Sequence, residues 1–428
     1  MKNLKAIGLL FVCIICIALA TSCKNDVEEI ESASDKKMSS VDSYTSKTTF
    51  EMSVKKDDTE PINLNLSATT KMVNANNDNY AYGTSTTTKI KERNETAESL
   101  RLLAYQNGYM YDVYTVDTLT NTLKAPSTPE EFEDFLYSQD EAFWGGYEAL
   151  NEKNAYKTEV VEHENGCRTV TMSDFSKEIT SSAESLVELL YDYTDSKAEN
   201  IIVTIELNPD YSYNKATMDF VFTDSSDGSI ANAKMETVYY DYNSTEWVEL
   251  AFAQECLVDD ITVIYEVSDA IDEMLKNRSG KFTSTIKEDY YSRIIENAAS
   301  WSNEDGNFSF EVVNKSNAND EVITTTYSDG VLKESRLHSE YKNSQRIKTT
   351  RAKAALEQLF FGATFSPLYI SDVDIVEDGR IYTFHMAYPG YVSYELTVKL
   401  VGDHISSVNA CKKPDSSWTS ETKLIEIK

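Results

Sequence analysis

Apolar side chains recur at every second position in several segments of the chain, and this period of two is typical of strands with one buried face. The segments are Phe50 to Val54, Ile62 to Ala68, Met218 to Phe222 and Leu396 to Leu400. Asn-Gly or Asp-Gly dipeptides, which accept the positive φ angles of tight hairpins, separate such segments. They begin at Asn107, Asn165, Asp227, Asp305, Asp329 and Asp378. The sequence therefore predicts antiparallel hairpins.

The glycines argue against a nucleotide-binding fold. Of the 14 glycines in the chain, six belong to these dipeptides and none forms a Gly-rich phosphate-binding motif. A periplasmic-type solute receptor is also disfavoured, because it would need alternating strands and helices around a parallel sheet.

Helix signals are fewer. The segment from Thr128 to Glu131 is a capping box with proline at the first helical position, and an apolar stripe follows from Phe132 to Leu136. A second amphipathic pattern runs from Ser181 to Tyr193, and a third from Ala352 to Phe360 is closed by Gly362. Each pattern has one apolar face, which favours helices packed on a sheet.

The order of a helix, a hairpin and paired strands occurs twice. Residues 160–172 resemble residues 375–386, and residues 218–234 resemble residues 396–412. We therefore predict an α+β protein with tandem curved antiparallel sheets, or half-barrels, each with helices packed on one face. The first domain is expected over 45–255 and the second over 280–428, with a helical linker over 256–279 that includes Ile271 to Leu275.

The first residues have the order of an export signal. Lys2 and Lys5 precede an uncharged apolar run from Ala6 to Ala20, which is shorter than the roughly 20 residues of a membrane span. Small residues then lead to Cys23. This arrangement resembles the lipobox of bacterial lipoproteins, although Leu19 lies four positions before the cysteine and Ser22 directly before it. The alternative is an ordinary signal peptide cleaved near Ala20, which would leave Cys23 a free thiol.

The lipobox resemblance implies cleavage after residue 22 and diacylglycerol on the Cys23 thiol. Residues 1–22 are then the signal peptide, and the acyl group anchors the mature chain to the outer side of the cell membrane. Residues 23–44 contain few large apolar side chains, and we interpret them as a tether, in part helical, between bilayer and body.

The charge balance excludes one class of partner. The chain has 40 Lys and Arg against 71 Asp and Glu, a formal net charge of −31. Such a chain would repel a phosphate backbone, so we expect no nucleic acid partner. Hydrophobic residues make up 41% of the chain, which is enough for folded cores despite the acidity.

Three cysteines remain in the exported body, Cys167, Cys256 and Cys411. One disulfide is allowed in an exported protein, with any of the three pairings, but the wide spacing favours buried small hydrophobic residues.

Catalytic and metal motifs are sparse. The sequence has no GxSxG, HExxH or Walker motif, and no two of its four histidines are four residues apart. The histidines are His163, His338, His385 and His404. His385 and His404 could approach each other across the last hairpins, but singly hydrogen-bonded strand histidines are the simpler interpretation. The segment from Asp224 to Gly228 has the wrong spacing for a calcium loop and is better explained as a turn. We predict no cofactor, no metal site and no enzymatic activity.

The chain contains 27 tyrosines, including Tyr109, Tyr111, Tyr114 and the run from Tyr239 to Tyr242. Rows of tyrosine on a curved sheet could line an amphipathic pocket. The simpler interpretation is that tyrosine forms strands well and tolerates half-burial.

A hairpin-rich sheet preceded by the segment from Met38 to Tyr44, with crossing helices and a cysteine-anchored signal, resembles the LolA/LolB-like lipoproteins of Gram-positive bacteria. The resemblance implies a half-barrel with helices on its concave side, where several members of that family carry lipids or lipoproteins. It transfers no ligand residue to this chain. We expect a binder or carrier of a hydrophobic or amphipathic ligand, such as a lipid, a lipopeptide or a cell-wall component. The alternative is a surface interaction or spacer module without a small-molecule ligand.

Overall fold

We analysed a computed structural model of the chain, which forms two compact units, Asn3–Ala253 (unit 1) and Gln254–Lys428 (unit 2). The structure describes residues 26–55, 61–74, 80–92, 95–116, 119–144, 155–175, 196–224, 230–277, 279–304, 306–318, 321–337, 340–347, 349–362, 365, 369–386, 393–413 and 416–427.

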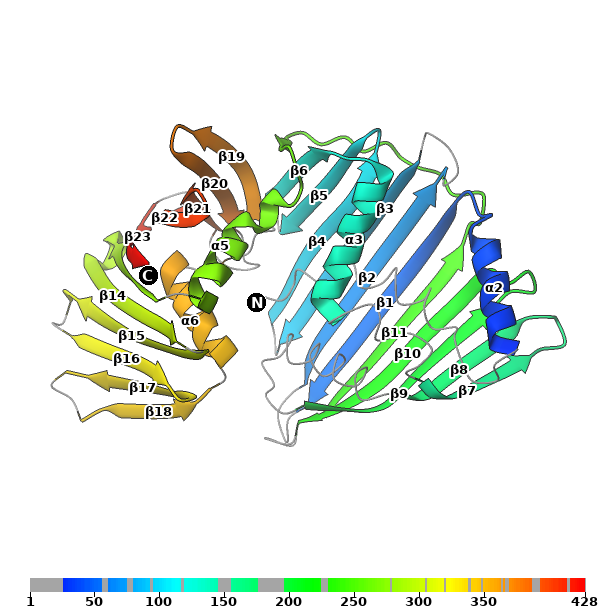
Figure 1. Cartoon of the computed structure of the whole chain (residues 1–428), viewed down its shortest axis with the longest axis horizontal. Coiled ribbons are helices and arrows are strands. Elements are labelled where there is room, and N and C mark those ends of the chain that lie inside the picture. Colours follow the sequence, from blue (N-terminus) through cyan, green and yellow to red (C-terminus); the bar gives the residue numbers. More distant parts are fainter. Residues whose placement is uncertain are drawn as a thin grey trace. The chain divides into compact units, whose positions relative to one another are not determined.

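The first sheet has 12 strands in the order β12-β6-β5-β4-β3-β2-β1-β11-β10-β9-β8-β7 (Figure 1). Neighbouring strands such as β1 and β2, β1 and β11, and β10 and β11 are antiparallel, and β1 and β11, the first and last long strands of unit 1, lie side by side at the centre of the sheet. Its strands are β1 (Tyr44–Lys55), β2 (Ile62–Val73), β3 (Ala81–Glu92), β4 (Glu95–Gln106), β5 (Tyr109–Val116), β6 (Leu119–Pro126), β7 (Ala155–Glu162), β8 (Arg168–Phe175), β9 (Ser196–Leu207), β10 (Tyr213–Asp224), β11 (Ile230–Tyr240) and, at the edge, β12 (Cys256–Leu257).

The sheet of unit 2 has 11 strands in the order β18-β17-β16-β15-β14-β13-β23-β22-β21-β20-β19, also with antiparallel neighbours. They are β13 (Gly280–Glu288), β14 (Arg293–Glu304), β15 (Asn307–Ser316), β16 (Val322–Ser328), β17 (Val331–Arg336), β18 (Lys342–Arg346), β19 (Ile370–Val376), β20 (Gly379–Met386), β21 (Ser393–Val401), β22 (His404–Lys413) and β23 (Trp418–Ile427).

The two sheets share one topology. In each unit a helix precedes a six-strand meander, β1 to β6 or β13 to β18, and a second helix leads to five further strands. The last of these, β11 or β23, pairs with the first strand of its own unit. The chain therefore contains two copies of one fold.

Four α-helices lie in the described residues: α2 (Asp26–Met38), α3 (Pro129–Trp144), α5 (Val263–Asn277) and α6 (Thr349–Phe361). The predicted capping box starts α3, since Thr128 Oγ1 accepts from the Glu131 amide at 3.2 Å and Glu131 Oε2 accepts from the Thr128 amide at 2.8 Å. Gly362, with φ +71°, ends α6 as expected. The helix predicted over residues 181–193 lies outside the described residues.

Hairpins form at four of the predicted dipeptides, those that begin at Asn107, Asn165, Asp329 and Asp378. Asn107 and Gly108 have φ angles of 54° and 78°, and Asp329 and Gly330 have 53° and 74°. Two consecutive positive φ angles are the mark of a type I′ turn, whose twist matches the flanking strands. The dipeptides at Asp227 and Asp305 begin outside the described residues.

The predicted α+β class is wrong, because the protein is mainly β. In the described residues, 23 strands stand against four α-helices. Strands such as Ala81–Glu92 (AYGTSTTTKIKE) are rich in serine and threonine and show little apolar alternation. The branched side chain of threonine nevertheless favours a strand, so a search for apolar alternation underestimates the strand content.

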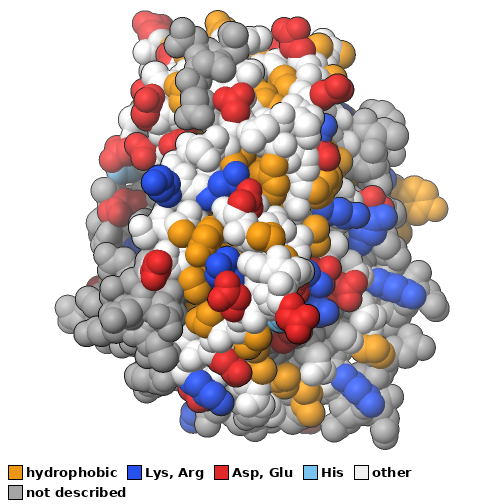
Figure 2. All heavy atoms as spheres, turned by 90° about the vertical axis from the view of Figure 1, so that its right-hand side faces the viewer, with side chains coloured by type: hydrophobic (Ala, Val, Ile, Leu, Met, Phe, Trp, Pro, Cys, Tyr) orange, Lys and Arg blue, Asp and Glu red, His pale blue; other side chains and the backbone are white. Residues whose placement is uncertain are grey.

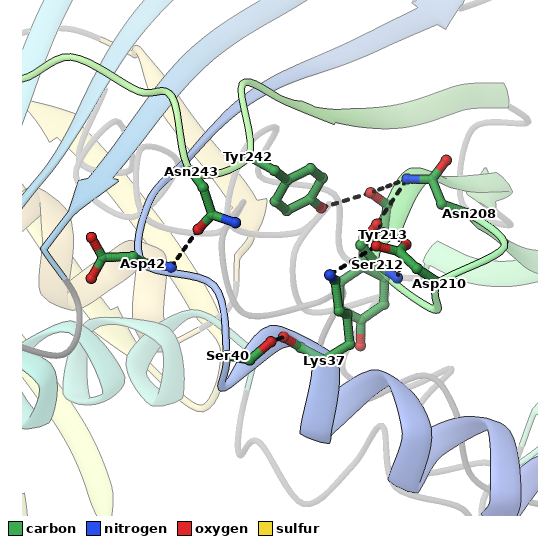
Figure 3. A network of polar contacts seen from close by, with 9 residues as sticks. All are labelled: Lys37, Ser40, Asp42, Asn208, Asp210, Ser212, Tyr213, Tyr242 and Asn243. Carbon is green, nitrogen blue, oxygen red and sulfur yellow. Dashed lines mark hydrogen bonds and ion pairs between the residues drawn. The ribbon is translucent and has the colours of Figure 1, made fainter.

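Residues 26–38 of the expected tether form α2, which packs against unit 1. Ile30 is 6% exposed and belongs to the apolar core cluster of this unit. At the other end of the helix, Lys37 Nζ lies 2.8 Å from Asp210 Oδ2 in the turn between β9 and β10 (Figure 3). Asp210 Oδ1 also accepts hydrogen bonds from the amide and hydroxyl of Ser212, at 3.1 and 2.7 Å.

The chain after α2 is held by the segment that follows β11. The Asp42 amide donates to Asn243 Oδ1 at 2.8 Å, and the Asn243 amide donates to the Ser43 carbonyl at 2.7 Å. The Tyr242 hydroxyl donates to the Tyr213 carbonyl at 2.6 Å (Figure 3). The C-terminal end of α2 is therefore fixed to two turns of unit 1.

On the side of the molecule seen in Figure 2, acidic and basic side chains are interspersed with apolar ones.

Residues 256–279, the expected linker, lie within unit 2 and contain α5. Arg380 Nη1 lies 2.6 Å from Glu266 Oε2, and the Tyr382 hydroxyl also donates to this carboxylate. Burial, and then the hydrogen bond to Glu266, raises the pKa of Tyr382 to about 12.

No helix in the described part of the chain is long and apolar enough to cross a bilayer.

Candidate ligand-binding face

The two helices in the described part of unit 1, α2 and α3, lie on one face of its sheet, which we call the inner face (Figure 1). Phe132 of α3 packs against Tyr82 and Tyr105, with ring centroids 5.5 and 5.8 Å apart. The register of β1 to β4 places Tyr82 on the same face as Phe50, which clusters with Ile30 of α2. The inner face is therefore the side where the family resemblance predicts a ligand.

One half of the inner face is apolar. It is formed by alternate residues of β1, β2 and β8 to β11, all less than 9% exposed, because their period of two turns one row of side chains to this side. Its main members are Phe50, Met52, Leu64, Leu66, Val170, Met172, Val203, Ile205, Met218, Phe220 and Met235.

The other half, on β3 to β6, is equally buried but mixed, and we call it the polar half because buried polar side chains lie there among apolar ones such as Leu103, Met110 and Leu123. Seven side chains in this part bear hydroxyl, amide or charged groups and are at most 9% exposed. They are Thr84, Thr86, Thr88, Ser99, Arg101, Asp112 and Asn121. Thr70 of β2 and Thr84 of β3 mark the border between the halves, with their hydroxyl oxygens 2.9 Å apart. A second pair, Thr48 and Thr237 at 2.8 Å, lies within the apolar half.

A buried ion pair is the strongest feature of the polar half. Arg101 Nε donates to Asp112 Oδ1 at 2.9 Å and Nη2 donates to Oδ2 at 2.6 Å, while the two side chains are 6% and 5% exposed. The turn at Asn107 and Gly108 sets Leu103 opposite Asp112, which makes Arg101 and Asp112 diagonal neighbours on one face. Such a pair gains little net stability, since desolvation offsets most of the Coulomb attraction.

The polar half could have been found from the sequence. A tight turn at residues 107 and 108 fixes which residues of β4 and β5 face each other, and Arg101 and Asp112 then fall on the same side. A pattern of alternating apolar residues does not reveal buried polar residues such as these two.

The opposite, outer face of β3 to β5 is sealed by the extended segment 245–252. Gln106 Oε1 accepts from Trp247 Nε1 at 2.8 Å and from the Leu250 amide at 3.0 Å. A Cβ atom on Gly83 would lie 2.8 Å from Cη2 of Trp247, so only glycine fits beneath this ring. Tyr111 packs on Phe252 at 5.8 Å between centroids.

The predicted lipidation site, Cys23, lies outside the described residues. Cys167, Cys256 and Cys411 are free thiols of intermediate exposure, so they are less buried than expected. Burial, together with the charge of Asp372, raises the pKa of Cys256 to about 11, which keeps this thiol protonated.

The structure does not bring His385 and His404 together. His385 pairs with Glu395 and His404 with Val401, six residues away along β21. His163 Nε2 lies 2.8 Å from Thr169 Oγ1. His338 and most of the 224–228 segment lie outside the described residues, within which no group of three or more His, Cys, Asp or Glu side chains could hold a metal ion.

The tyrosines of unit 1 mostly serve packing. Tyr239 is 8% exposed and packs against Tyr44 and Tyr213, with centroids 5.9 and 5.6 Å apart. Tyr111 is buried on the outer face and Tyr114 on the inner face. These positions agree with the simpler interpretation of tyrosine as a strand former.

Comparisons with known proteins show only distant likenesses. No family model and no curated protein matches the sequence. The structure of LprF from Mycobacterium bovis is 11% identical and covers 52% of this chain and 95% of that one, with a TM-score of 0.27. A putative AttH from Nitrosomonas europaea is 7% identical, covers 89% and 92%, and has a TM-score of 0.13. MucB in complex with MucA(peri) is 9% identical, covers 94% and 92%, and has the same TM-score of 0.13. Likenesses this distant carry no argument about function.

Proposed function

We propose that the chain is a lipoprotein, anchored at Cys23 to the outer side of the cell membrane, that binds a hydrophobic or amphipathic ligand on the inner face of unit 1. The anchor is supported by the order of charged, apolar and small residues before Cys23. In this proposal the protein is a non-enzymatic binder or carrier.

The division of the inner face carries the proposal. Side chains such as Phe50 and Met218 would pack against an acyl chain, while Arg101, Asp112 and the buried threonines of β3 would contact a polar head. A face built only for stability would more often be apolar throughout, because buried polar groups cost desolvation energy. A ligand with one apolar and one polar end matches both halves.

The alternative, a spacer or surface interaction module, is favoured by the helices. Phe132 is completely buried between Tyr82 and Tyr105, and Ile30 fills part of the apolar half. In this second candidate function the helices permanently occupy the place of a ligand. The two functions differ in whether α2 or α3 moves to admit a molecule.

Extraction of the purified exported protein with organic solvent, together with native mass spectrometry, separates the two functions. We expect a co-purifying lipid that is lost in the Met218→Gln variant, because a buried amide would face the acyl chain. The matched control is Ile202→Gln on the neighbouring strand, where the side chain is 42% exposed and the lipid should be retained. Circular dichroism checks the fold of both variants. A protein without bound lipid and without uptake of lipid probes would support the spacer.

A further inference from the structure

The outer face of the sheet in unit 2 contains a hollow of about 310 Å³. We call the opposite side the inner face of this unit, because Phe282 packs there on Phe360 of α6, with centroids 5.0 Å apart. The hollow is lined mainly by odd-numbered residues of four adjacent strands, β13, β23, β22 and β21, together with Ala410 and Ser420. It therefore belongs to unit 2 alone and is separate from the face proposed to bind the ligand in unit 1.

The strand register arranges the lining in two neighbouring rows. One row contains Lys287, Thr419, Cys411 and Glu395, and the other contains Thr285, Glu421, Asn409 and Thr397. Thr419 and Cys411 form the middle of the first row, and Glu421 and Asn409 form the middle of the second. Short side chains of threonine, asparagine and cysteine make up most of the lining, which accounts for a hollow among the longer charged side chains.

The two carboxylates that line the hollow, Glu395 and Glu421, already have partners of opposite sign. Glu395 contacts His385 Nε2 and Lys413 Nζ, each at 3.3 Å. Glu421 lies 2.8 Å from Lys423 Nζ, and this contact lowers the pKa of the Glu421 carboxyl, with a smaller contribution from Lys287. A ligand with a single charge would meet like and opposite charges together, so the charged residues of the lining do not select an anion or a cation.

We propose that this hollow is a binding site for a neutral polyhydroxylated ligand, such as one sugar unit. Asn409, Thr397, Thr285 and Thr419 make no side-chain hydrogen bond with other described residues, and each offers both a donor and an acceptor. Ligand hydroxyl groups also need both. The volume is at the lower end of the roughly 300–1,000 Å³ typical of ligand sites, which suits one ring. No aromatic ring is among the residues that line the hollow as described, so the expected affinity is weak.

Cys411 provides a direct test because its thiol lies in the hollow. The full chain is alkylated with iodoacetamide in the presence of methyl β-glucopyranoside or its N-acetylglucosamine analogue, and each cysteine is followed by peptide mass spectrometry. With a glycoside at ten times its Kd, the alkylation rate of Cys411 should fall about tenfold, because only about one site in eleven stays free. The rate at Cys167 in unit 1 is the internal control and should not change.

The variant Asn409→Ala should raise the Kd of the glycoside roughly tenfold, since it removes hydrogen bonds to the ligand. Asn409 is exposed, so the fold should survive, and Asn343→Ala on exposed β18 is the matched control with unchanged protection. The proposal is overturned if neither glycoside protects Cys411, if Asn409→Ala binds as the parent does, or if only an anionic sugar such as glucuronate protects. Each result is independent of whether unit 1 binds a lipid.

Discussion

The buried ion pair of Arg101 and Asp112 leads to a prediction about stability. Removing one partner leaves the other charge buried without compensation, which costs about 3–5 kcal/mol in comparable cases. We therefore predict that Asp112→Ala lowers the free energy of unfolding of unit 1 by about this amount, measured by urea denaturation.

The matched control for this pair lies between the strands β3 and β4. Lys89 Nζ is 3.0 Å from Glu98 Oε2, but the two side chains are 52% and 54% exposed. Glu98→Ala should change the stability by less than about 1 kcal/mol, because water screens this pair. Equal effects of the two substitutions would show that the Arg101 pair is not desolvated in solution.

Asp210 makes a prediction about pH. The hydrogen bond from Lys37, followed by those from Ser212, lowers the pKa of Asp210 from 3.8 to about 2. Because the folded-state pKa is below the unfolded one, the stabilisation is complete above about pH 4 and is lost as the pH falls through 2. The Asp210 side chain is 55% exposed, so we expect the pair to contribute less than about 1 kcal/mol.

Carbon-detected NMR of the Asp210 carboxyl measures this directly. The midpoint should lie near 2 in the parent and move towards 3.8 in Lys37→Met. A parent midpoint of 3.8 would mean that α2 is not held to the turn between β9 and β10.

For helices and turns, short sequence motifs predicted the structure correctly where the local backbone geometry favours one residue type. The capping box at Thr128, the turn at Asn107 and Gly108, and the stop at Gly362 all act within a few residues. Strands such as β3 and the packing of α2 depend on neighbours distant in the sequence. The helix α2 has few apolar residues, so its sequence resembles that of a tether. Only the contact of Ile30 with the core of unit 1 shows that this helix is packed.

The segment that seals the outer face depends on Gly83. In Gly83→Ala the new methyl group would press on the Trp247 ring at 2.8 Å, so either the ring or the strand must shift. We predict a loss of about 1–3 kcal/mol in unfolding free energy and a change in Trp247 fluorescence.

A double-mutant cycle identifies the cause of that loss. Trp247→Leu removes the ring, so adding Gly83→Ala to this variant should cost much less than it costs the parent. Additive effects would place the cost in the strand backbone rather than in contact with Trp247.

At the scale of the whole molecule, the chain repeats one topology twice, and the sequence showed this only in part. The resemblance between residues 160–172 and 375–386 matches equivalent strands, because β8 and β20 are both the second strand after the central helix. The resemblance between residues 218–234 and 396–412 is displaced by one strand, since β10 corresponds to β22. Alternating strands joined by short turns look alike, so sequence similarity does not fix which hairpins correspond.

The proposed membrane location rests on Cys23. We predict that Cys23→Ala abolishes acylation and moves the protein from the membrane fraction to the soluble exported fraction, because no other anchor is expected. Intact mass spectrometry of the parent should show a diacylated chain that begins at residue 23. An unmodified chain that begins elsewhere would contradict the anchor.

Ligand binding on the inner face of unit 1 is the central claim, and photo-crosslinking tests it most directly. A fatty acid with a diazirine group on its chain is added to the purified full chain, irradiated, and located by peptide mass spectrometry. We predict label on the apolar half of the inner face, at Met52, Met218 or Met235, that an unlabelled fatty acid competes away. Label confined to exposed apolar side chains such as Val248 and Ile375, or no competable label, would contradict the claim.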